Sequence, residues 1–266
     1  MQAYGLTETA SVAVTQLPNQ TDTETVGSVI PCSELRLVDW AEAGYRNTDK
    51  PNPRGEILIG GDNIALGYYK LPDLTRTEFK VIDGVRYFST GDIGEMLPNG
   101  NLKIIDRKKD LVKLSGGEYL SLNKVESVVK LLPVVDNCCV VAQPGKSDCI
   151  VLICPNYKKV IDYLAENNKT KRDEIESHLE LQKSINEKFY ELKKMLDNSP
   201  HIISRFLKEL TDHCLKQNIH RFEIPTKQIF VKEIWTPDTG LVTDSLKLKR
   251  RALEKYYDTE ISAVYF

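Results

Sequence analysis

The sequence lacks the features that define several common protein classes. None of its six cysteines forms a CxxC pair with metal-ligand spacing. The grouping of His213, Cys214 and His220 also fits no tetrahedral zinc pattern. No apolar run approaches the roughly 18 residues that a membrane-spanning helix needs. A formal net charge of −2 lacks the positive excess of proteins that bind nucleic acid or anionic membranes, so we expect no nucleic-acid partner.

The composition is that of an ordinary globular protein. With 266 residues, 41% of them hydrophobic and 28% charged, the chain is long enough for one large or two modest domains. Cysteines outside such motifs are typically small, buried, apolar residues of a protein in a reducing compartment. We apply this interpretation to Cys32, Cys138, Cys139, Cys149, Cys154 and Cys214.

The first stretch that suggests chemistry is Tyr4-Gly5-Leu6-Thr7-Glu8-Thr9. It combines an aromatic face that can stack on adenine, a small residue beside it, a hydroxyl for a phosphate oxygen and a carboxylate for Mg2+. Taken alone, the same residues are equally compatible with a plain polar loop.

A second stretch runs from Ser89 to Lys113. We expect a strand to end at Ser89 and a sharp turn to follow, which leaves the carboxylate of Asp92 exposed at the strand end, where it can accept hydrogen bonds from a ligand hydroxyl. A Pro-Asn-Gly turn then joins two short strands, and five consecutive charged residues follow at 106–110. By itself such a run is most often a solvated surface turn.

The pattern of elements predicts an α+β fold. Short alternating segments at 26–29, 34–38 and 55–61 predict a distorted β-barrel or sheet. Beyond the charged run we predict an amphipathic helix over 122–132 and buried strands at 137–142 and 148–154. The segment 157–222 is rich in helix formers, and we predict two or three solvent-facing helices there; a coiled-coil surface is the alternative, but no heptad pattern is sustained.

Several motifs in a fixed order resemble those of the adenylate-forming enzymes, the superfamily of acyl-CoA synthetases, luciferases and peptide-synthetase adenylation domains. These motifs are YGLTE at 4–8, STGD at 89–92, DRKKD at 106–110 and GGE at 116–118. The phrases TDKPNPRGEILIGG, IDRKKDLVKL and WTPDTGLVTDSLKLKR are most similar to eukaryotic long-chain acyl-CoA synthetases. The resemblance covers nearly the whole chain except the helical segment.

The resemblance implies roles for residues before the charged run and within it. Tyr4 with Gly5 would lie against the adenine, Thr7 would meet the α-phosphate, and Glu8 would help to hold Mg2+ as a catalytic and metal-binding residue. Asp92 and Arg107 would hold the ribose, and Lys109 would be the hinge on which a small C-terminal lid swings.

For the second half of the chain the resemblance implies a coenzyme A tunnel and a catalytic lysine. Gly116 and Gly117 would line the passage for pantetheine, although their sequence alone favours a simple tight turn. Lys247 takes the catalytic place and Arg250 follows it. The family's usual glycine before that lysine is Leu246 here, so Lys249 is the fallback candidate.

The implied organisation is residues 1–108 as the C-terminal part of a large AMP-binding domain and residues 109–266 as the lid, with 157–222 as a helical insertion in it. The superfamily's upstream Ser/Thr- and Gly-rich phosphate loop, followed by Pro-Lys-Gly, does not occur in this sequence. We therefore expect the chain to be the C-terminal part of a larger enzyme and to have little activity alone.

The implied function is that of a long-chain fatty acid–CoA ligase, with ATP, Mg2+, coenzyme A and a long-chain fatty acid as its cofactors and substrates. The resemblance also implies an intracellular parent at the cytosolic face of the endoplasmic reticulum or another membrane. Two alternatives stay open. One is a different adenylate-forming ligase, and the other is a short non-catalytic form that binds nucleotide or a partner through the helical insertion.

Overall fold

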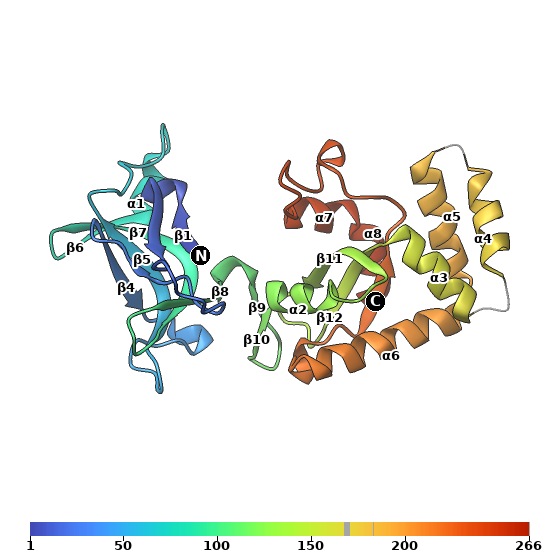
Figure 1. Ribbon diagram of the computed structural model, residues 1–266, viewed down its shortest axis with the longest axis horizontal. Helices are drawn as coiled ribbons and strands as arrows, with labels where there is room; N and C mark the ends of the chain where they lie inside the picture. The colour runs from blue at the N-terminus through green and yellow to red at the C-terminus, as the bar shows by residue number, and fades with distance from the viewer. Residues whose placement is uncertain (168–170, 183, 266) are drawn as a thin grey trace. The chain divides into compact units, whose positions relative to one another are not determined.

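The computed structural model describes residues 1–167, 171–182 and 184–265 and forms two compact units, Met1–Leu111 and Val112–Phe266 (Figure 1). The boundary predicted from the sequence lay between residues 108 and 109. In the described part of the chain, no helix has the length and apolar character needed to cross a membrane.

The first unit is built from two antiparallel sheets. The larger has the order β4, β5, β7, β6, with β8 also paired to β7. Its strands are β4 Ser33–Val38, β5 Arg54–Gly61, β6 Phe79–Ile82, β7 Val85–Met96 and β8 Leu102–Arg107. The smaller sheet consists of β1 Ala3–Leu6, β2 Ser11–Thr15 and β3 Ser28–Val29. A bridge between Gly27 and Leu102 connects the two sheets. This curled half-barrel arrangement confirms the predicted distorted sheet in its coarse form.

Strand β7 differs from the prediction, because it does not end at Ser89 but continues to Met96. The ladder with β5 pairs Leu58 with Ser89 and Glu56 with Ile93, so residues 90–92 form a bulge opposite a single residue of β5. Gly91 adopts a φ of 70°, which a glycine accommodates without strain. The predicted turn is therefore a bulge within one long strand.

The core of the first unit is an apolar cluster formed by residues of the two sheets and of the loop after β5. Helix α1, Pro72–Glu78, begins at a proline, whose fixed φ suits the first helical position, and Phe79 directly after it is buried. The buried members of this cluster are Ala13, Val14, Ile57, Ile59, Ile64, Phe79, Phe88 and Leu102.

The second unit contains a three-stranded sheet with helices on both faces (Figure 1). The strands are β11 Val135–Ala142, β12 Cys149–Pro155 and β13 Lys227–Phe230, and the first two match the predicted buried strands closely. Alternate residues of β11 and β12 belong to two separate clusters. One includes the helices between residues 122 and 216, and the other includes α7 Arg250–Tyr256 and α8 Asp258–Tyr265. Because both faces are covered, the strands are continuous apolar runs.

The helical segment has more helices than predicted, and they are less exposed. The predicted helix over 122–132 is α2, Leu122–Val129. The described residues of the segment form α3 Tyr157–Asn167, α4 Arg172–Glu180, α5 Ile185–Asp197 and α6 Pro200–Lys216. Leu179, Leu192 and Phe206 are buried in the same cluster as α2, so the prediction of solvent-facing helices was wrong in this respect. These helices are amphipathic, and buried apolar residues from each of them belong to one cluster with one face of the sheet.

Five of the six cysteines are buried, as predicted, whereas Cys32 is exposed. All five buried cysteines belong to the second unit. Burial raises the pKa of Cys139 to about 12 and of Cys214 to about 11, so these thiols are protonated and unreactive at neutral pH.

Candidate functional site

The carboxylate of Asp92 is the centre of the site in the first unit. Strands β7 and β8 pair Asp92 with Arg107, and the Arg107 Nε donates a hydrogen bond of 2.7 Å to Asp92 Oδ1. The hydroxyl of Tyr4, on β1, donates a hydrogen bond of 2.7 Å to Oδ2. Three predicted site residues from three strands thus form one hydrogen-bonded group.

Asp92 is buried, with only 2% of its surface exposed, and this corrects the expectation of an exposed carboxylate. The bulge explains the difference, because the Asp92 backbone N–H donates to Thr90 Oγ1 and the same hydroxyl donates to the carbonyl oxygen of Ile57. These contacts turn the Asp92 side chain toward Tyr4 and Arg107.

The two donors to Asp92 have different exposure and charge. Burial and the Asp92 carboxylate raise the pKa of Tyr4 far above its usual value, so the phenol stays neutral and donates. The hydrogen bond to Asp92 raises the pKa of Arg107, which keeps its charge. The side chain of Arg107 is 60% exposed, so part of its guanidinium is accessible to a ligand.

A cavity of about 280 Å³ adjoins this group. Its lining includes Glu8, Tyr68, Ser89, Arg107 and Lys109. Within the described residues, the buried hydroxyl of Ser89 has no hydrogen-bond partner. A buried polar group without a partner is costly, so a polar ligand atom in this cavity would satisfy it.

Glu8 lies in a short 3-10 turn, Thr7–Thr9, that the loop after β5 holds in place. The Tyr68 hydroxyl donates a hydrogen bond of 2.7 Å to Glu8 Oε1, and the Ala65 backbone N–H donates to the Glu8 carbonyl oxygen at 2.9 Å. The sequence analysis assigned no role to Tyr68 and missed this contact. Thr7 and Gly5 are exposed.

Glu8 fits a divalent cation that arrives with a nucleotide. The described part of the chain contains no group of three or more His, Cys, Asp or Glu residues that could hold a metal ion by itself. Mg2+ in nucleotide sites is commonly bound by one or two carboxylates together with substrate phosphates and water. A single carboxylate at the cavity wall is consistent with that arrangement.

In the second unit, Lys247 lies in an exposed loop that is closed by backbone hydrogen bonds. The Lys249 N–H donates to the Leu241 carbonyl oxygen at 2.9 Å, and the Thr243 N–H donates to the Lys247 carbonyl oxygen at 2.8 Å. Leu246 has a φ of 60°, in the left-handed region that disfavours a leucine. This conformation explains why glycine is usual at that position in the family that the sequence resembles.

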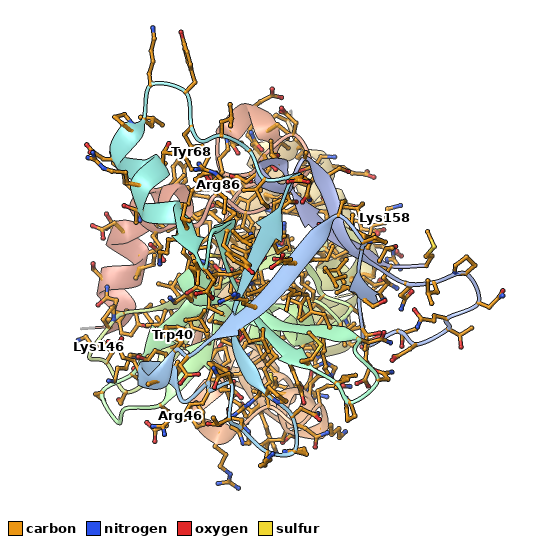
Figure 2. All side chains as sticks on the ribbon, turned by 90° about the vertical axis from the view of Figure 1, so that its left-hand side faces the viewer. Trp40, Arg46, Tyr68, Arg86, Lys146 and Lys158 are labelled. Carbon is orange, nitrogen blue, oxygen red and sulfur yellow. The ribbon has the colours of Figure 1, made fainter. Side chains whose placement is uncertain are left out.

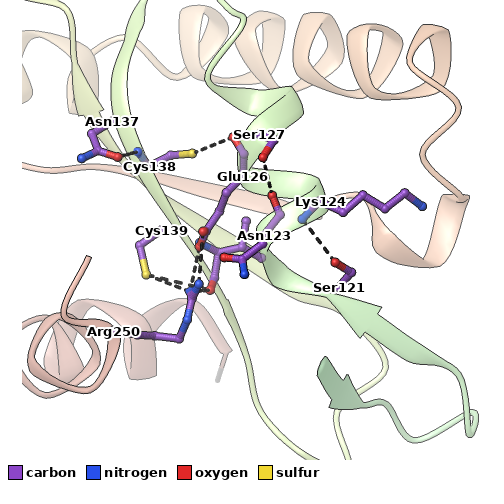
Figure 3. A network of polar contacts seen from close by, with 10 residues as sticks. Ser121, Asn123, Lys124, Glu126, Ser127, Asn137, Cys138, Cys139 and Arg250 are labelled. Carbon is purple, nitrogen blue, oxygen red and sulfur yellow. Dashed lines mark hydrogen bonds and ion pairs between the residues drawn. The ribbon is translucent and has the colours of Figure 1, made fainter. Parts of the chain in front are cut away.

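Arg250, the first residue of α7, fastens this loop to the body of the second unit (Figure 3). Its Nη1 and Nη2 donate to the two carboxylate oxygens of Glu126, at 2.7 and 3.1 Å, and Nη1 also donates to the Val140 carbonyl oxygen at 2.8 Å. Glu126 Oε1 accepts a further hydrogen bond from the Val140 N–H. The chain three residues beyond Lys247 is therefore fixed to α2 and β11.

The paired glycines form a tight turn between β9 Leu111–Lys113 and β10 Tyr119–Ser121. The Gly117 N–H donates to the Leu114 carbonyl oxygen at 3.0 Å, and the Leu114 N–H donates to that of Glu118 at 2.9 Å. Gly116 and Gly117 are both exposed. Their predicted contact with pantetheine stays a prediction.

The structure therefore brings one set of predicted site residues together, leaves Gly5 and Thr7 exposed in the first unit, and places the remaining ones in the second unit. In the first unit, Tyr4, Asp92 and Arg107 are directly bonded, and Glu8, Arg107 and Lys109 line one cavity. Gly116, Gly117 and Lys247 belong to the second unit.

This chain is similar in sequence and in fold to several known proteins. The family model described as "AMP-binding enzyme" matches residues 1–69. Long chain acyl-CoA synthetase 8 of Arabidopsis thaliana is 37% identical over 99% of this chain, which spans 34% of that relative. The adenylation domain of the carboxylic acid reductase from Segniliparus rugosus, solved with AMP and a co-purified carboxylic acid, has a TM-score of 0.69 and 25% identity; the match covers 91% of this chain and 34% of that one.

A second solved structure supports the fold alone. The O-succinylbenzoate coenzyme A synthetase of Bacillus subtilis, in complex with ATP and magnesium ion, has a TM-score of 0.61 at 23% identity, over 95% of this chain and 41% of that one. The Arabidopsis relative matches nearly all of this chain, and the YGLTE motif lies inside the segment that the family model matches. The chain belongs to the AMP-binding enzyme family, and its curated relatives there are long-chain acyl-CoA synthetases.

Proposed function

We propose that this chain carries the ribose-binding group, the catalytic lysine and the coenzyme A contact of a long-chain fatty acid–CoA ligase. One observation carries the proposal: the buried Asp92 carboxylate is held by Tyr4 and Arg107 beside a cavity that Glu8 and Lys109 also line. The chain spans about a third of the Arabidopsis relative, so the activity proposed is that of a whole enzyme containing such a segment.

In the first half-reaction, a fatty acid carboxylate attacks the α-phosphorus of ATP and pyrophosphate leaves, which gives an acyl-adenylate. Asp92 would accept hydrogen bonds from the ribose hydroxyls, since a carboxylate has about four acceptor sites and the protein uses one on each oxygen. Arg107 would donate to the ribose through its exposed N–H groups. The Tyr4 hydroxyl is engaged by Asp92, so its ring is the part left to contact adenine.

The first half-reaction brings two anions together, so neutralisation of charge is the main requirement. Glu8 would hold Mg2+, which neutralises the phosphates, and Thr7 would donate to the α-phosphate. Lys247 would supply a second positive charge at the developing transition state. Its exposed ammonium on a loop with a fixed base suits a group that must enter and leave a site.

In the second half-reaction, a coenzyme A thiolate attacks the acyl carbonyl and AMP leaves. Rotation about Lys109 would replace Lys247 with the Gly116–Gly117 turn, whose exposed backbone would line the pantetheine passage. We propose, from the resemblance alone, that the whole enzyme acts at the cytosolic face of the endoplasmic reticulum or another membrane.

A chimera tests this proposal. These 266 residues would replace the matching segment of the Arabidopsis relative, and the products from palmitate, ATP and coenzyme A would be measured. We expect palmitoyl-CoA from the chimera. Lys247→Ala should reduce pyrophosphate release by about 100-fold or more, the scale for loss of one transition-state charge contact.

Lys249→Ala is the matched control, because Lys249 is also exposed and lies two residues away. It should retain activity. A loss with Lys249→Ala but not with Lys247→Ala would move the catalytic role to Lys249. A folded chimera that activates short or aromatic acids but no long-chain acid would contradict the substrate assignment.

A further inference from the structure

We propose that Tyr68 is a positioning residue for the divalent cation: its hydroxyl holds one oxygen of Glu8, so that the other oxygen is presented to a cation bound to the nucleotide phosphates. The proposal rests on the proposed function, because the cation would arrive with ATP. It adds a residue from a different loop to the site.

The contact itself is short and specific. The Tyr68 hydroxyl donates to Glu8 Oε1 at 2.7 Å, and both residues line the cavity of about 280 Å³. Within the described residues, Glu8 Oε2 has no protein partner that would compete with a cation. A carboxylate with one oxygen occupied can present the other in a fixed direction.

The loop around Tyr68 is joined to the Glu8 turn at the backbone as well. The Ala65 N–H donates to the Glu8 carbonyl oxygen at 2.9 Å, and Asn63 Nδ2 donates to the Thr9 carbonyl oxygen at 3.0 Å. The side-chain contact is therefore the third of three contacts between the same two segments. The carboxylate direction, rather than the backbone position, is what depends on Tyr68.

Tyr68 is held in its own position by neighbours that the cation would not touch. Its backbone N–H donates to Thr75 Oγ1 at 2.9 Å, and its ring meets Phe79 edge-on with 5.6 Å between centroids. Gly67 has a φ of 144°, and a Cβ there would come within 2.4 Å of Thr75 Cγ2, so the close approach requires glycine.

Arg86 fixes the preceding part of the loop, and Figure 2 shows its position near Tyr68. Its Nε donates to the Ala65 carbonyl oxygen at 3.2 Å and its Nη2 to that of Leu66 at 2.6 Å. The guanidinium also lies over the Phe79 ring, 4.9 Å from its centroid. The tyrosine hydroxyl thus approaches Glu8 from a preorganised loop, and such preorganisation lowers the entropic cost of binding.

The chemistry of the pair suits Mg2+ or Mn2+. Mg2+ requires near-octahedral geometry and tolerates little movement of its ligands. Removing the hydroxyl should leave Glu8 able to rotate, and the metal-dependent part of nucleotide binding should weaken.

The test compares nucleotide binding with and without metal in the chimera, in which these 266 residues replace the matching segment of the Arabidopsis relative; the chimera without further substitutions serves as the wild type. Titration calorimetry would measure AMP with EDTA, ATP with EDTA, and ATP with Mn2+, and water proton relaxation would report bound Mn2+ independently. Tyr68→Phe should bind AMP as the wild type does but lose about tenfold in the gain that Mn2+ gives to ATP, the scale of one hydrogen bond to a charged group.

Tyr69→Phe is the matched control, because the neighbouring Tyr69 is 85% exposed, and it should change nothing. Glu8→Gln should lose the same gain as Tyr68→Phe, and the double variant should lose no more than the single ones. An unchanged Mn2+ gain in Tyr68→Phe would overturn the proposal. Equal loss of AMP and Mn2+·ATP binding would also overturn it, since that would mark a purely structural role.

The two proposals fail in different ways. If the folded chimera binds no AMP, the proposed nucleotide site is wrong and this inference falls with it. If the wild type binds AMP but Mn2+ adds nothing to ATP binding, the nucleotide site stands and the Tyr68 inference alone is overturned.

Discussion

Each unit contains a buried carboxylate paired with an arginine, and the two pairs differ in how the arginine is covered. The carboxylates are alike, because the side chains of Asp92 and Glu126 are 3% and 5% exposed. The side chain of Arg107 is 60% exposed, whereas that of Arg250 is 17% exposed. An arginine that fixes a carboxylate and still faces a cavity can bind a ligand, while a covered one can only hold structure.

The hydrogen bonds follow the same division. Arg107 donates to Asp92 through Nε at 2.7 Å, and Tyr4 shares the carboxylate. Arg250 donates hydrogen bonds to both carboxylate oxygens of Glu126, and also to the Val140 carbonyl oxygen and the Cys139 sulfur (Figure 3). We call the Asp92–Arg107 pair, whose arginine is exposed, the open pair, and the Glu126–Arg250 pair, whose arginine is mostly covered, the closed pair. We assign the closed pair to holding the base of the Lys247 loop.

Breaking the closed pair should give the largest effect. Arg250→Met would leave the Glu126 charge buried without its partner, and removal of one member of a buried pair typically costs about 3–5 kcal/mol. Urea unfolding followed by the fluorescence of Trp235, which is buried in the second unit, would measure the loss. Glu126→Met combined with Arg250→Met should recover most of it, because two apolar side chains remove the uncompensated charge.

If Arg250→Met unfolds at the wild-type urea concentration, the pair is not structural and the comparison between the two arginines fails. If the double variant is as unstable as the single one, the cost comes from lost packing of the arginine stem rather than from the charge.

Changing the open pair should affect binding more than stability. Arg107→Lys keeps the positive charge but loses the planar fork that can hold Asp92 and a ribose hydroxyl together. We expect about tenfold weaker AMP binding by calorimetry, and a change in unfolding free energy within about 1 kcal/mol, the usual range for a partly exposed ion pair. Loss of stability with unchanged AMP affinity would contradict this division of roles.

The sequence predicts the members of the open pair but not their environment. STGD and DRKKD identify Asp92 and Arg107 by order and spacing, yet the burial of Asp92 depends on Tyr4, which lies 88 residues earlier. Tyr68 was missed for the same reason, since its partner Glu8 is 60 residues away and no local pattern connects them. Contacts of this kind arise from strand pairing and packing, which local propensity does not specify.

The second unit shows a different limit of prediction. Its strands β11 and β12 were found because continuous apolar runs are a strong signal. The helices between Tyr157 and Lys216 were predicted as helices, but their buried faces were not, because many Lys and Glu residues mask an apolar stripe. Arg250 was noted only as a follower of Lys247, and its partner Glu126 lies 124 residues earlier.

Alkaline pH should separate the two units. Burial raises the pKa of Cys154 to about 11 and of Cys149 to about 12, whereas an unfolded thiol titrates near 8.5. The folded state then binds more protons than the unfolded state above about pH 8.5, so stability is complete below that pH and falls as the pH rises. In the first unit the raised groups Tyr4 and Tyr68 are phenols, which titrate near pH 10 when unfolded, so the loss of stability there begins at a higher pH.

Unfolding of single-tryptophan variants from pH 7 to 11 would measure this difference, because Trp40 reports on the first unit and Trp235 on the second. The Trp235 transition should weaken from about pH 9 and the Trp40 transition from about pH 10. Replacement of Cys149 and Cys154 by alanine should flatten the pH dependence of the second unit. A first unit that weakens at the lower pH would contradict the assignment of the effect to the buried thiols.

The smallest expected effect concerns the loop that the closed pair anchors. Leu246 is 61% exposed and has a φ of 60°, a conformation that costs a non-glycine residue roughly 1–2 kcal/mol. Glycine removes this strain but adds entropy to the unfolded chain, so Leu246→Gly should stabilise the second unit by at most about 1 kcal/mol. Asn218→Gly is the matched control: Asn218 has a φ of 58°, and because asparagine tolerates this region its replacement should change stability less. Urea unfolding of both variants would compare them, and a destabilised Leu246→Gly would mean that the leucine side chain makes a contact that outweighs its backbone strain.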